Sequence, residues 1–208
     1  MQKTSKKNNI LIGVCGGIAA YKACELVRIL KKEGYPVKVV MTDAATRFVT
    51  PLTFQTLSEN PVYLDMWQFQ KDEESTVASH QSPEKKEEKK RVQHISLSQW
   101  TDFCVIAPAS ANTLSKIAQG ICDNLLTTVV CALDEKTKVV FAPAMNENMW
   151  KNPIIQQNVK KLTGLKKYEI LDPGRGELAC GVYGQGRMPE AKDIFNRIKK
   201  LLPLKRKR

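Results

Sequence analysis

The chain has 208 residues and 42% of them are hydrophobic, which is enough for one large domain with a substantial core or for two small ones. No apolar run is long enough to span a bilayer, and the run at 10–14 is too short for the apolar segment of a signal peptide. These observations exclude a membrane-spanning protein, and we expect a cytoplasmic location with no membrane partner.

The formal net charge of +12 suggests nucleic-acid binding, but the position of the charge argues against it. Nine basic residues near the two ends account for nine of the twelve charges and leave +3 for the body. Basic ends are usually solvated tails, and no nucleic-acid-binding module accompanies these. We therefore expect no nucleic-acid partner. The nine residues are Lys3, Lys6, Lys7, Lys199, Lys200, Lys205, Arg206, Lys207 and Arg208.

Six cysteines are present, and none belongs to a C-x-x-C pair. Their spacing does not suit zinc, and without a secretory signal a disulfide framework is not expected. We therefore predict no metal site, and we predict that most of the cysteines are small core residues. Cys180 is the exception, because it lies in a glycine-rich stretch. The other five are Cys15, Cys24, Cys104, Cys122 and Cys131.

A short apolar run at 9–15 predicts a strand, and Gly16, Gly17 and Ile18 separate it from a helical pattern that ends at Gly34. Glycines let a ligand approach the backbone, and a helix N-terminus presents free N–H groups, so this turn suits a phosphate. The signal is weak, because the G-x-G-x-x-G spacing is absent and such turns are common in α/β proteins.

A second strand is predicted at 37–42. Thr42 falls at its C-terminal end, on the same rim as the glycine turn, where the hydroxyl could reach a phosphate or a ribityl group. The alternative is that Thr42 or Asp43 simply caps a helix that starts at Ala44.

A short helix at 51–57 and a short strand at 61–64 precede a segment of mixed charge at about 68–93. This segment has almost nothing to bury, so it cannot offset its ordering entropy and is predicted to be a disordered surface insertion. His94 opens the stretch in which order resumes. Its imidazole can exchange protons near neutral pH, although a lone histidine is more often structural.

Residues 102–107 predict another strand, and the turn at 108–113 leads into a helix that runs to Gly120. The small polar residues of this turn could receive an anion or a polar ring, or they could simply cap the helix. The apolar stretch at 123–133 is ambiguous, and we predict a helix because the alternating order requires one before the strand at 138–142.

The strand at 138–142 ends at a proline, and Asn146 follows with Met145, Met149 and Trp150 around it. In an open α/β sheet, ligands bind just beyond the C-terminal ends of the strands. The Asn146 amide could donate to a carboxylate or a carbonyl while the apolar side chains exclude water. The alternative is that Asn146 caps the next helix and that Met149 and Trp150 belong to the core.

Five glycines lie in the stretch 173–188, a composition typical of a flexible lid. A cysteine on such a lid is not a core residue. The Cys180 thiol could act as an acid, with Arg175 or Arg187 available to stabilise a thiolate or to bind phosphate.

Further helices are predicted at 153–162 and 189–202, with a last strand at 168–171 between them. Alternating strands and helices predict an α/β fold, a three-layer Rossmann-like or flavodoxin-like parallel sheet with helices on both faces. We expect one domain over 1–208 that carries the charged insertion and two basic tails.

In this combination the sequence resembles the homo-oligomeric flavin-containing cysteine decarboxylases, and among them those of coenzyme A biosynthesis that act on phosphopantothenoylcysteine. The resemblance runs from about residue 10 to residue 202 and is interrupted by the charged insertion. Each motif alone is modest, but all of them in this order are highly specific. The motifs are the turn at 16–22, His94, the turn at 108–113, the stretch 143–150, and Ala179-Cys180-Gly181 before Gly186-Arg187-Met188.

The resemblance implies a bound FMN and a substrate whose carboxylate Asn146 binds. The implied cofactor-binding residues are Gly16, Gly17, Ile18, Thr42, Ser110, Ala111, Asn112, Thr113, Met145 and Trp150. The implied substrate-binding residues are Asn146, Ala179, Gly181 and Met188.

The resemblance also implies FMN-dependent decarboxylation of 4′-phosphopantothenoylcysteine to 4′-phosphopantetheine, through a thioaldehyde and an enethiolate. His94 would act in the oxidative half as a base or orienting group, and Cys180 would supply the final proton. Related peptide-cysteine decarboxylases lack the lid cysteine, and related flavin prenyltransferases lack the Met-Asn motif. A regulatory flavoprotein of the family has an acidic tail that is absent here. Asn146 and Cys180 together therefore favour the full decarboxylase.

Members of this family hold FMN between the subunits of trimers, some of which form dodecamers, so the resemblance implies a homotrimer. In many bacteria the chain continues into a ligase domain, for which this chain has no room. We expect a standalone enzyme, with a separate phosphopantothenoylcysteine synthetase as a candidate partner. The charged insertion just before His94 departs from the family pattern.

Overall fold

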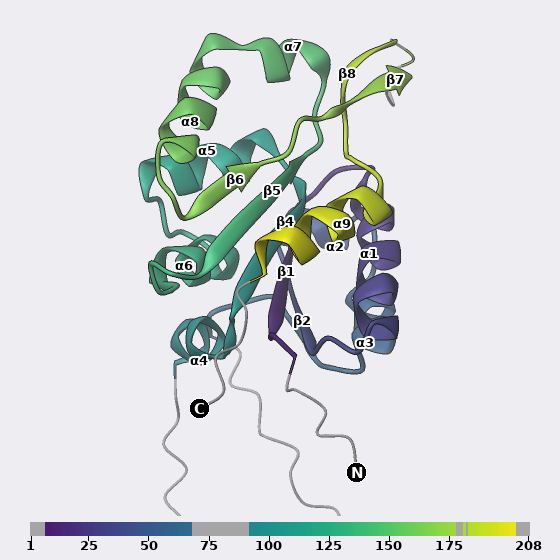
Figure 1. Ribbon diagram of the computed structural model, residues 1–208, viewed down its shortest axis with the longest axis vertical. Coiled ribbons are helices and arrows are strands. Elements are labelled where there is room, and N and C mark those ends of the chain that lie inside the picture. The colour runs from purple at the N-terminus through teal and green to yellow at the C-terminus, as the bar shows by residue number, and fades with distance from the viewer. Residues whose placement is uncertain (1–6, 68–91, 178–180, 182, 203–208) are drawn as a thin grey trace, which may run out of the picture.

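Six parallel strands form a central sheet in the order β3-β2-β1-β4-β5-β6 (Figure 1). The structure is a computed structural model, and it describes residues 7–67, 92–177, 181 and 183–202. The strands are β1 (Ile10–Val14), β2 (Val37–Met41), β3 (Val62–Tyr63), β4 (Phe103–Ala109), β5 (Lys138–Pro143) and β6 (Tyr168–Ile170). β1 pairs with β2 on one side and β4 on the other, so the strand order reverses beside β1. Ligands of open α/β sheets bind at such a reversal.

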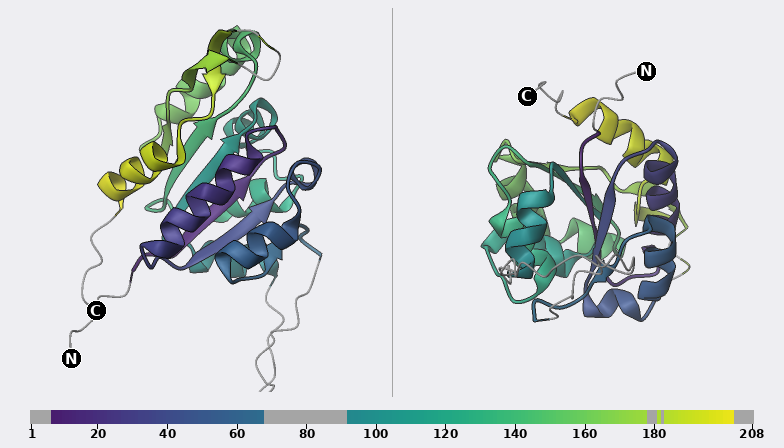
Figure 2. Two further views of the ribbon diagram at one scale, coloured as in Figure 1. Left: turned by 90° about the vertical axis from the view of Figure 1, so that its right-hand side faces the viewer. Right: turned by 90° about the horizontal axis from the view of Figure 1, so that it is seen from below.

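Two layers of helices cover the sheet, as the alternating side chains of β1 require. Ile10, Ile12 and Val14 belong to one core cluster, and Leu11 and Cys15 belong to the other. Successive strand residues point to opposite faces, so both faces are apolar and both must be covered. The view from below shows the sheet between the two layers (Figure 2). The predicted three-layer α/β fold is confirmed.

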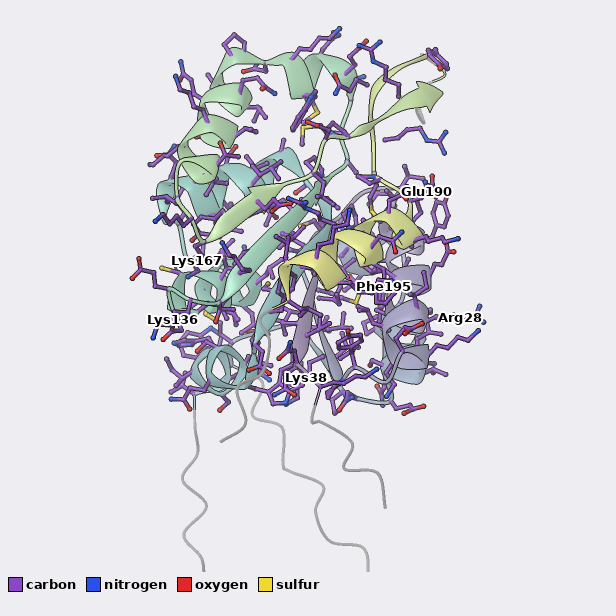
Figure 3. The ribbon with its side chains drawn as sticks, in the orientation of Figure 1. Arg28, Lys38, Lys136, Lys167, Glu190 and Phe195 are labelled. Atoms are coloured by element: carbon purple, nitrogen blue, oxygen red, sulfur yellow. The ribbon has the colours of Figure 1, made fainter. Side chains whose placement is uncertain are left out.

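One face is covered mainly by α1 (Ala20–Lys32), α3 (Pro51–Ser58) and α9 (Ala191–Leu201). On α9, Phe195 packs edge-on against Tyr35 with ring centroids 6.4 Å apart (Figure 3). The other face is covered mainly by α4 (Gln93–Trp100), α5 (Ala111–Gln119), α6 (Leu125–Ala132) and α8 (Pro153–Thr163). Two short helices, α2 (Asp43–Thr46) and α7 (Glu147–Lys151), follow β2 and β5 directly. The predicted helix at 123–133 is confirmed as α6, which Asn124 caps.

The glycine-rich stretch forms a hairpin, which differs from the prediction. β7 (Gly174–Glu177) pairs antiparallel with β8 (Tyr183–Arg187), so 168–171 is not the last strand and 173–188 is not wholly a loop. Glycine content suggested a loop, but here glycine provides room for neighbouring side chains. A Cβ at Gly176 would lie 2.8 Å from the Arg187 side chain. The hairpin rises above the sheet beside α7 (Figure 1).

The predicted insertion is shorter than expected at its end, because α4 already begins at Gln93. Residues 68–91, together with the predicted tails at 1–6 and 203–208, lie outside the described residues. The disordered insertion, the basic tails and the single domain over 1–208 therefore stay predictions. Within the described part of the chain, no helix has both the length and the apolar composition to cross a membrane.

Candidate active site

Four strand-to-helix turns meet at the carboxyl edge of the sheet. Backbone hydrogen bonds tie them together: Thr42 N–H donates to Val14 O over 3.0 Å, and Cys15 N–H donates to Pro108 O over 3.2 Å. Ala144 N–H donates to Ala109 O over 3.1 Å. The glycine turn, the end of β2, the turn after β4 and the stretch after β5 therefore lie together, as the sequence predicted.

The two glycines of the turn between β1 and α1 have different surroundings: Gly16 is tightly packed and Gly17 is uncrowded. A Cβ at Gly16 would lie 2.5 Å from Ala44 Cβ, so this position brings the turn against α2. A Cβ at Gly17 would have no neighbour within 4 Å, and Ile18 is 61% exposed. Ala20 N–H and Lys22 N–H already donate to Gly17 O and Ala19 O, so the uncrowded backbone at Gly17 is the part of this turn that an anion could approach.

Thr42 follows β2 directly, and its hydroxyl has no hydrogen-bond partner within the described part of the chain. It occupies the N-cap position of α2, yet its side chain makes no capping hydrogen bond. Its Oγ1 is buried and without a hydrogen bond among the described residues. A buried polar atom without a partner is costly and commonly marks a ligand position. Simple capping by Thr42 therefore does not explain this residue, and a ligand oxygen nearby would.

The turn after β4 is fixed by its own side chains. Ser110 Oγ accepts a hydrogen bond from Thr113 N–H over 3.3 Å, so Ser110 is the N-cap of α5. Ala111 and Thr113 are buried, and Asn112 is exposed. Beneath the turn, burial raises the pKa of the Cys15 thiol although hydrogen bonds with the turn oppose the shift. The capping alternative holds for Ser110, and Asn112 is the side chain that the turn presents outward.

Asn146 is the N-cap of α7. The alternative that this residue caps the next helix is therefore correct for its side-chain oxygen. Asn146 Oδ1 accepts a hydrogen bond from Asn148 N–H over 2.8 Å, and the residue is exposed. Trp150 is buried, while Met149 is 48% exposed and is not core. Met145 N–H donates to Gly186 O over 3.0 Å. The stretch after β5 is therefore joined to the hairpin.

Glu147 makes the second connection between this stretch and the hairpin. Its Oε1 accepts a hydrogen bond from Gln185 N–H over 3.3 Å and lies 2.9 Å from Lys151 Nζ. The hydrogen bond from Lys151, followed by that from Gln185, lowers the pKa of the Glu147 carboxyl. The sequence pointed to neither Glu147 nor Gln185, because a contact across 38 positions leaves no local spacing signal.

A cavity of about 450 Å³ lies beside the edge, between the hairpin and the start of α9. Arg175, Arg187 and Met188 are among its lining residues, so one predicted substrate-binding residue faces it. Glu190 also lines it and pairs with Lys22 of α1 at 2.7 Å (Figure 3). The ion pair therefore connects a wall of the cavity to α1, the helix that follows the glycine turn. None of the four strand-to-helix turns lines the cavity.

His94 is the predicted site residue that the structure does not bring to the edge. It lies in the first turn of α4, which packs against α6. Its Nδ1 is buried without a hydrogen bond among the described residues. Gly181 is described and exposed, whereas Ala179 and Cys180 lie outside the described residues. The roles of these residues stay predictions.

The Flavoprotein family matches residues 1–203. The chain belongs to this family. A Streptococcus mutans protein named "Probable phosphopantothenoylcysteine decarboxylase" is 41% identical over 193 residues, which cover 93% of this chain and 98% of that protein. The first curated relatives, named bifunctional proteins of coenzyme A biosynthesis, come from Borreliella burgdorferi and Bacillus subtilis. This chain spans only 43% and 41% of their lengths.

Two solved structures share the fold closely. One is a cysteine variant of PPC decarboxylase in complex with pantothenoylaminoethenethiol, with a TM-score of 0.76, 33% identity, and coverage of 93% of this chain and 97% of that one. The other is "The FMN binding protein AtHal3", with a TM-score of 0.73, 33% identity, and coverage of 93% and 96%. The family resemblance of the sequence is thereby confirmed.

Proposed function

We propose that the chain is an FMN-dependent phosphopantothenoylcysteine decarboxylase, a carboxy-lyase that yields 4′-phosphopantetheine for coenzyme A biosynthesis. The observation that carries the proposal is the meeting of four strand-to-helix turns, three of which are family motifs, at one sheet edge. The Streptococcus mutans relative, nearly all of which this chain covers, bears the same activity in its name. The cysteine variant of PPC decarboxylase, with its enethiol ligand, supports the same reaction class.

The residues at the edge fit a flavin mononucleotide. The open backbone at Gly17, just before α1, suits its phosphate. The Thr42 hydroxyl, which has no hydrogen bond to any described residue, suits a phosphate or ribityl oxygen. Asn112, exposed after the Ser110 cap, and Met145 would complete the contacts from the other turns. When bound, FMN supplies reversible hydride transfer, which makes loss of carbon dioxide from the substrate easy.

The side chains of this chain would bind and orient the substrate. Asn146 keeps its oxygen on the α7 cap, which turns its amide into a fixed donor for the substrate carboxylate. Gly181 and Met188 would contact the substrate from the hairpin, together with Ala179. His94 would serve as a base or orienting group and Cys180 as the final proton donor, as the resemblance implies.

His94 is separated from the edge within one chain, and this observation favours assembly. A homotrimer, or a dodecamer built from such trimers, would allow a histidine of one subunit to serve a flavin of its neighbour. We further propose a cytoplasmic enzyme. The bifunctional relatives are named for coenzyme A biosynthesis, so we also propose a separate phosphopantothenoylcysteine synthetase as partner.

The test is anaerobic incubation of the purified protein with phosphopantothenoylcysteine, followed by flavin absorbance and product mass. We expect yellow protein, release of carbon dioxide and formation of 4′-phosphopantetheine. Cys180→Ser is expected to stop at the oxidised enethiol with the flavin reduced. Bound FMN without turnover would favour another thiol substrate or a regulatory flavoprotein. A colourless protein that cannot be reconstituted with FMN would overturn the proposal.

A further inference from the structure

Two exposed cysteines meet at helix α6, which contradicts the prediction that cysteines other than Cys180 are mostly core. Cys122 lies in the loop before α6, and Cys131 lies in the last turn of that helix. Cys15 and Cys104 are buried, as predicted. Burial, and after it the neighbouring Cys131 thiol, raises the pKa of the Cys122 thiol, so the two thiols lie close to each other. The pair is therefore an exposed dithiol on the protein surface.

The backbone explains why the two thiols meet. Cys122 Sγ lies 3.6 Å from Gly120 O and 4.0 Å from Thr127 O. In an α-helix, the carbonyl of residue 127 receives the N–H of residue 131, and side chains lean toward the N-terminus. The Cys131 side chain is thus directed along the helix toward the carbonyl over which Cys122 lies. Thr128 Oγ1 holds the loop in place by donating to Cys122 O over 3.2 Å.

We propose that Cys122 and Cys131 form a reversible dithiol–disulfide pair that small-molecule disulfides such as glutathione disulfide oxidise. One cysteine thiolate attacks a sulfur of glutathione disulfide and releases the first glutathione. The second cysteine attacks the mixed disulfide, forms the Cys122–Cys131 bond and releases the second glutathione. The two protons of the protein thiols end on the two glutathione thiols, so two electrons pass from the protein to the oxidant.

Lys167 places one positive charge beside Cys131. Lys167 Nζ donates to Leu133 O over 2.8 Å and lies 3.4 Å from Val130 O, which places its ammonium at the end of α6 (Figure 3). Burial lowers the pKa of Lys167, and interactions with Cys104, Cys131, Asp134 and Glu135 oppose that shift, so carboxylates also lie near this ammonium. Glutathione disulfide carries carboxylates that an ammonium attracts. We therefore assign the first attack to Cys131.

Cys122 is suited to the resolving step. Burial, followed by the neighbouring Cys131 thiol, raises the pKa of the Cys122 thiol, which disfavours Cys122 as the first nucleophile. It lies on a loop rather than in a helix, and a loop can adjust to the torsion that a disulfide demands. Closure of the pair would link this loop to the end of α6.

Peptide mapping tests the proposal directly. The flavin-loaded, full-length protein is incubated with glutathione disulfide, alkylated and digested with trypsin without reduction. Because 117–135 contains neither lysine nor arginine, one tryptic peptide, 117–136, holds both cysteines. We expect this peptide to lose two hydrogen atoms and to escape alkylation. Cleavage before Asp123 should leave the two fragments linked, and reduced glutathione should reverse the change.

Single variants provide the matched controls. Cys122→Ser and Cys131→Ser should each accumulate glutathione on the remaining cysteine of the peptide, because no second thiol can displace it. Cys24→Ser, which changes a half-buried cysteine on α1, should behave like the unaltered protein. Stable glutathione on both cysteines, a bond to a different cysteine, or an unchanged peptide would each overturn the proposal. The experiment needs neither the proposed substrate nor turnover.

Discussion

The Glu147 carboxylate lies where a side chain at residue 184 would have to be. A Cβ built on Gly184 would be 2.7 Å from Glu147 Oε2 and 2.8 Å from its Cδ. The same carboxylate accepts the Gln185 N–H. The hairpin therefore docks on α7 because strand β8 has no side chain at this position and because Glu147 uses the space.

Gly184→Ala is expected to displace the hairpin from α7. Overpacking of this kind costs about 1–3 kcal/mol, and we expect the specificity constant kcat/KM for phosphopantothenoylcysteine to fall about tenfold. The added methyl should be tolerated better when Glu147→Ala has already removed the carboxylate. The measurement is a double-mutant cycle on kcat/KM, in which the two changes together should cost less than their sum.

Gly174→Ala is the matched control on the same hairpin. Its Cβ would have its nearest neighbour at 3.8 Å, an ordinary van der Waals distance. We expect activity close to that of the unaltered protein. Two outcomes would contradict this explanation: an equal loss of kcat/KM in Gly174→Ala and Gly184→Ala, or strictly additive effects of Gly184→Ala and Glu147→Ala. Either would show that Gly184 is not needed to make room for Glu147.

Substitutions at Asn146 separate its capping role from its substrate role. Aspartate is as good an N-cap as asparagine, so Asn146→Asp should change the free energy of unfolding by less than about 0.5 kcal/mol. It replaces an amide donor by a negative charge, which repels the substrate carboxylate, and kcat/KM should fall about 100-fold or more. Asn146→Ala should lose about 1 kcal/mol of stability as well. Turnover by Asn146→Asp at the normal rate would exclude contact with the carboxylate.

Thr42→Val should weaken FMN binding without lowering the stability of the folded protein. The hydroxyl has no hydrogen bond among the described residues, so its removal should leave the stability of the flavin-free protein equal or higher. Loss of one hydrogen bond to the flavin should raise the FMN dissociation constant about tenfold. Quenching of FMN fluorescence measures that constant.

Thr163→Val controls for threonine replacement. The Thr163 hydroxyl donates to Val159 O over 3.0 Å at the end of α8, away from the four turns. This variant should leave the FMN dissociation constant unchanged. If Thr42→Val destabilises the flavin-free protein and binds FMN normally, the Thr42 hydroxyl is structural.

The layered fold was predictable because it depends on local patterns. Apolar runs such as 10–14 determine strands, and the side chains of Ile10, Ile12 and Val14 alternate with Leu11 between the two cores. The site residues that directly follow the strands could also be predicted to lie together, since the carboxyl ends of parallel strands share one edge. Thr42 could be placed at this edge from the sequence, but only the structure shows that its hydroxyl lacks a partner.

The contacts between distant segments were not predictable. Strand β8 reads as a loop because of its glycines, and its fit to α7 depends on Glu147, which lies 37 positions before Gly184. Exposure of Cys122 and Cys131 was also missed, because an apolar neighbourhood in the sequence suggests burial. Their exposure depends on how the loop before α6 folds back over the helix. Tertiary packing decides both features.

The Lys22–Glu190 pair should make stability depend on acid pH. The hydrogen bond from Lys22 is the main cause that lowers the pKa of the Glu190 carboxyl below its ordinary value of 4.5. A carboxyl whose pKa is lower in the folded state stabilises that state above its unfolded pKa, and the contribution is lost as the pH falls through the folded value. Stability should therefore decline below pH 4.5 partly because of this pair. Denaturant unfolding of the unaltered protein and of Glu190→Gln across this range measures the decline, which should be shallower in the variant. Because Glu190 precedes α9 and Lys22 belongs to α1, the same variant also reports whether this pair holds α9 against α1. Parallel pH curves for the two proteins would show that the pair contributes nothing.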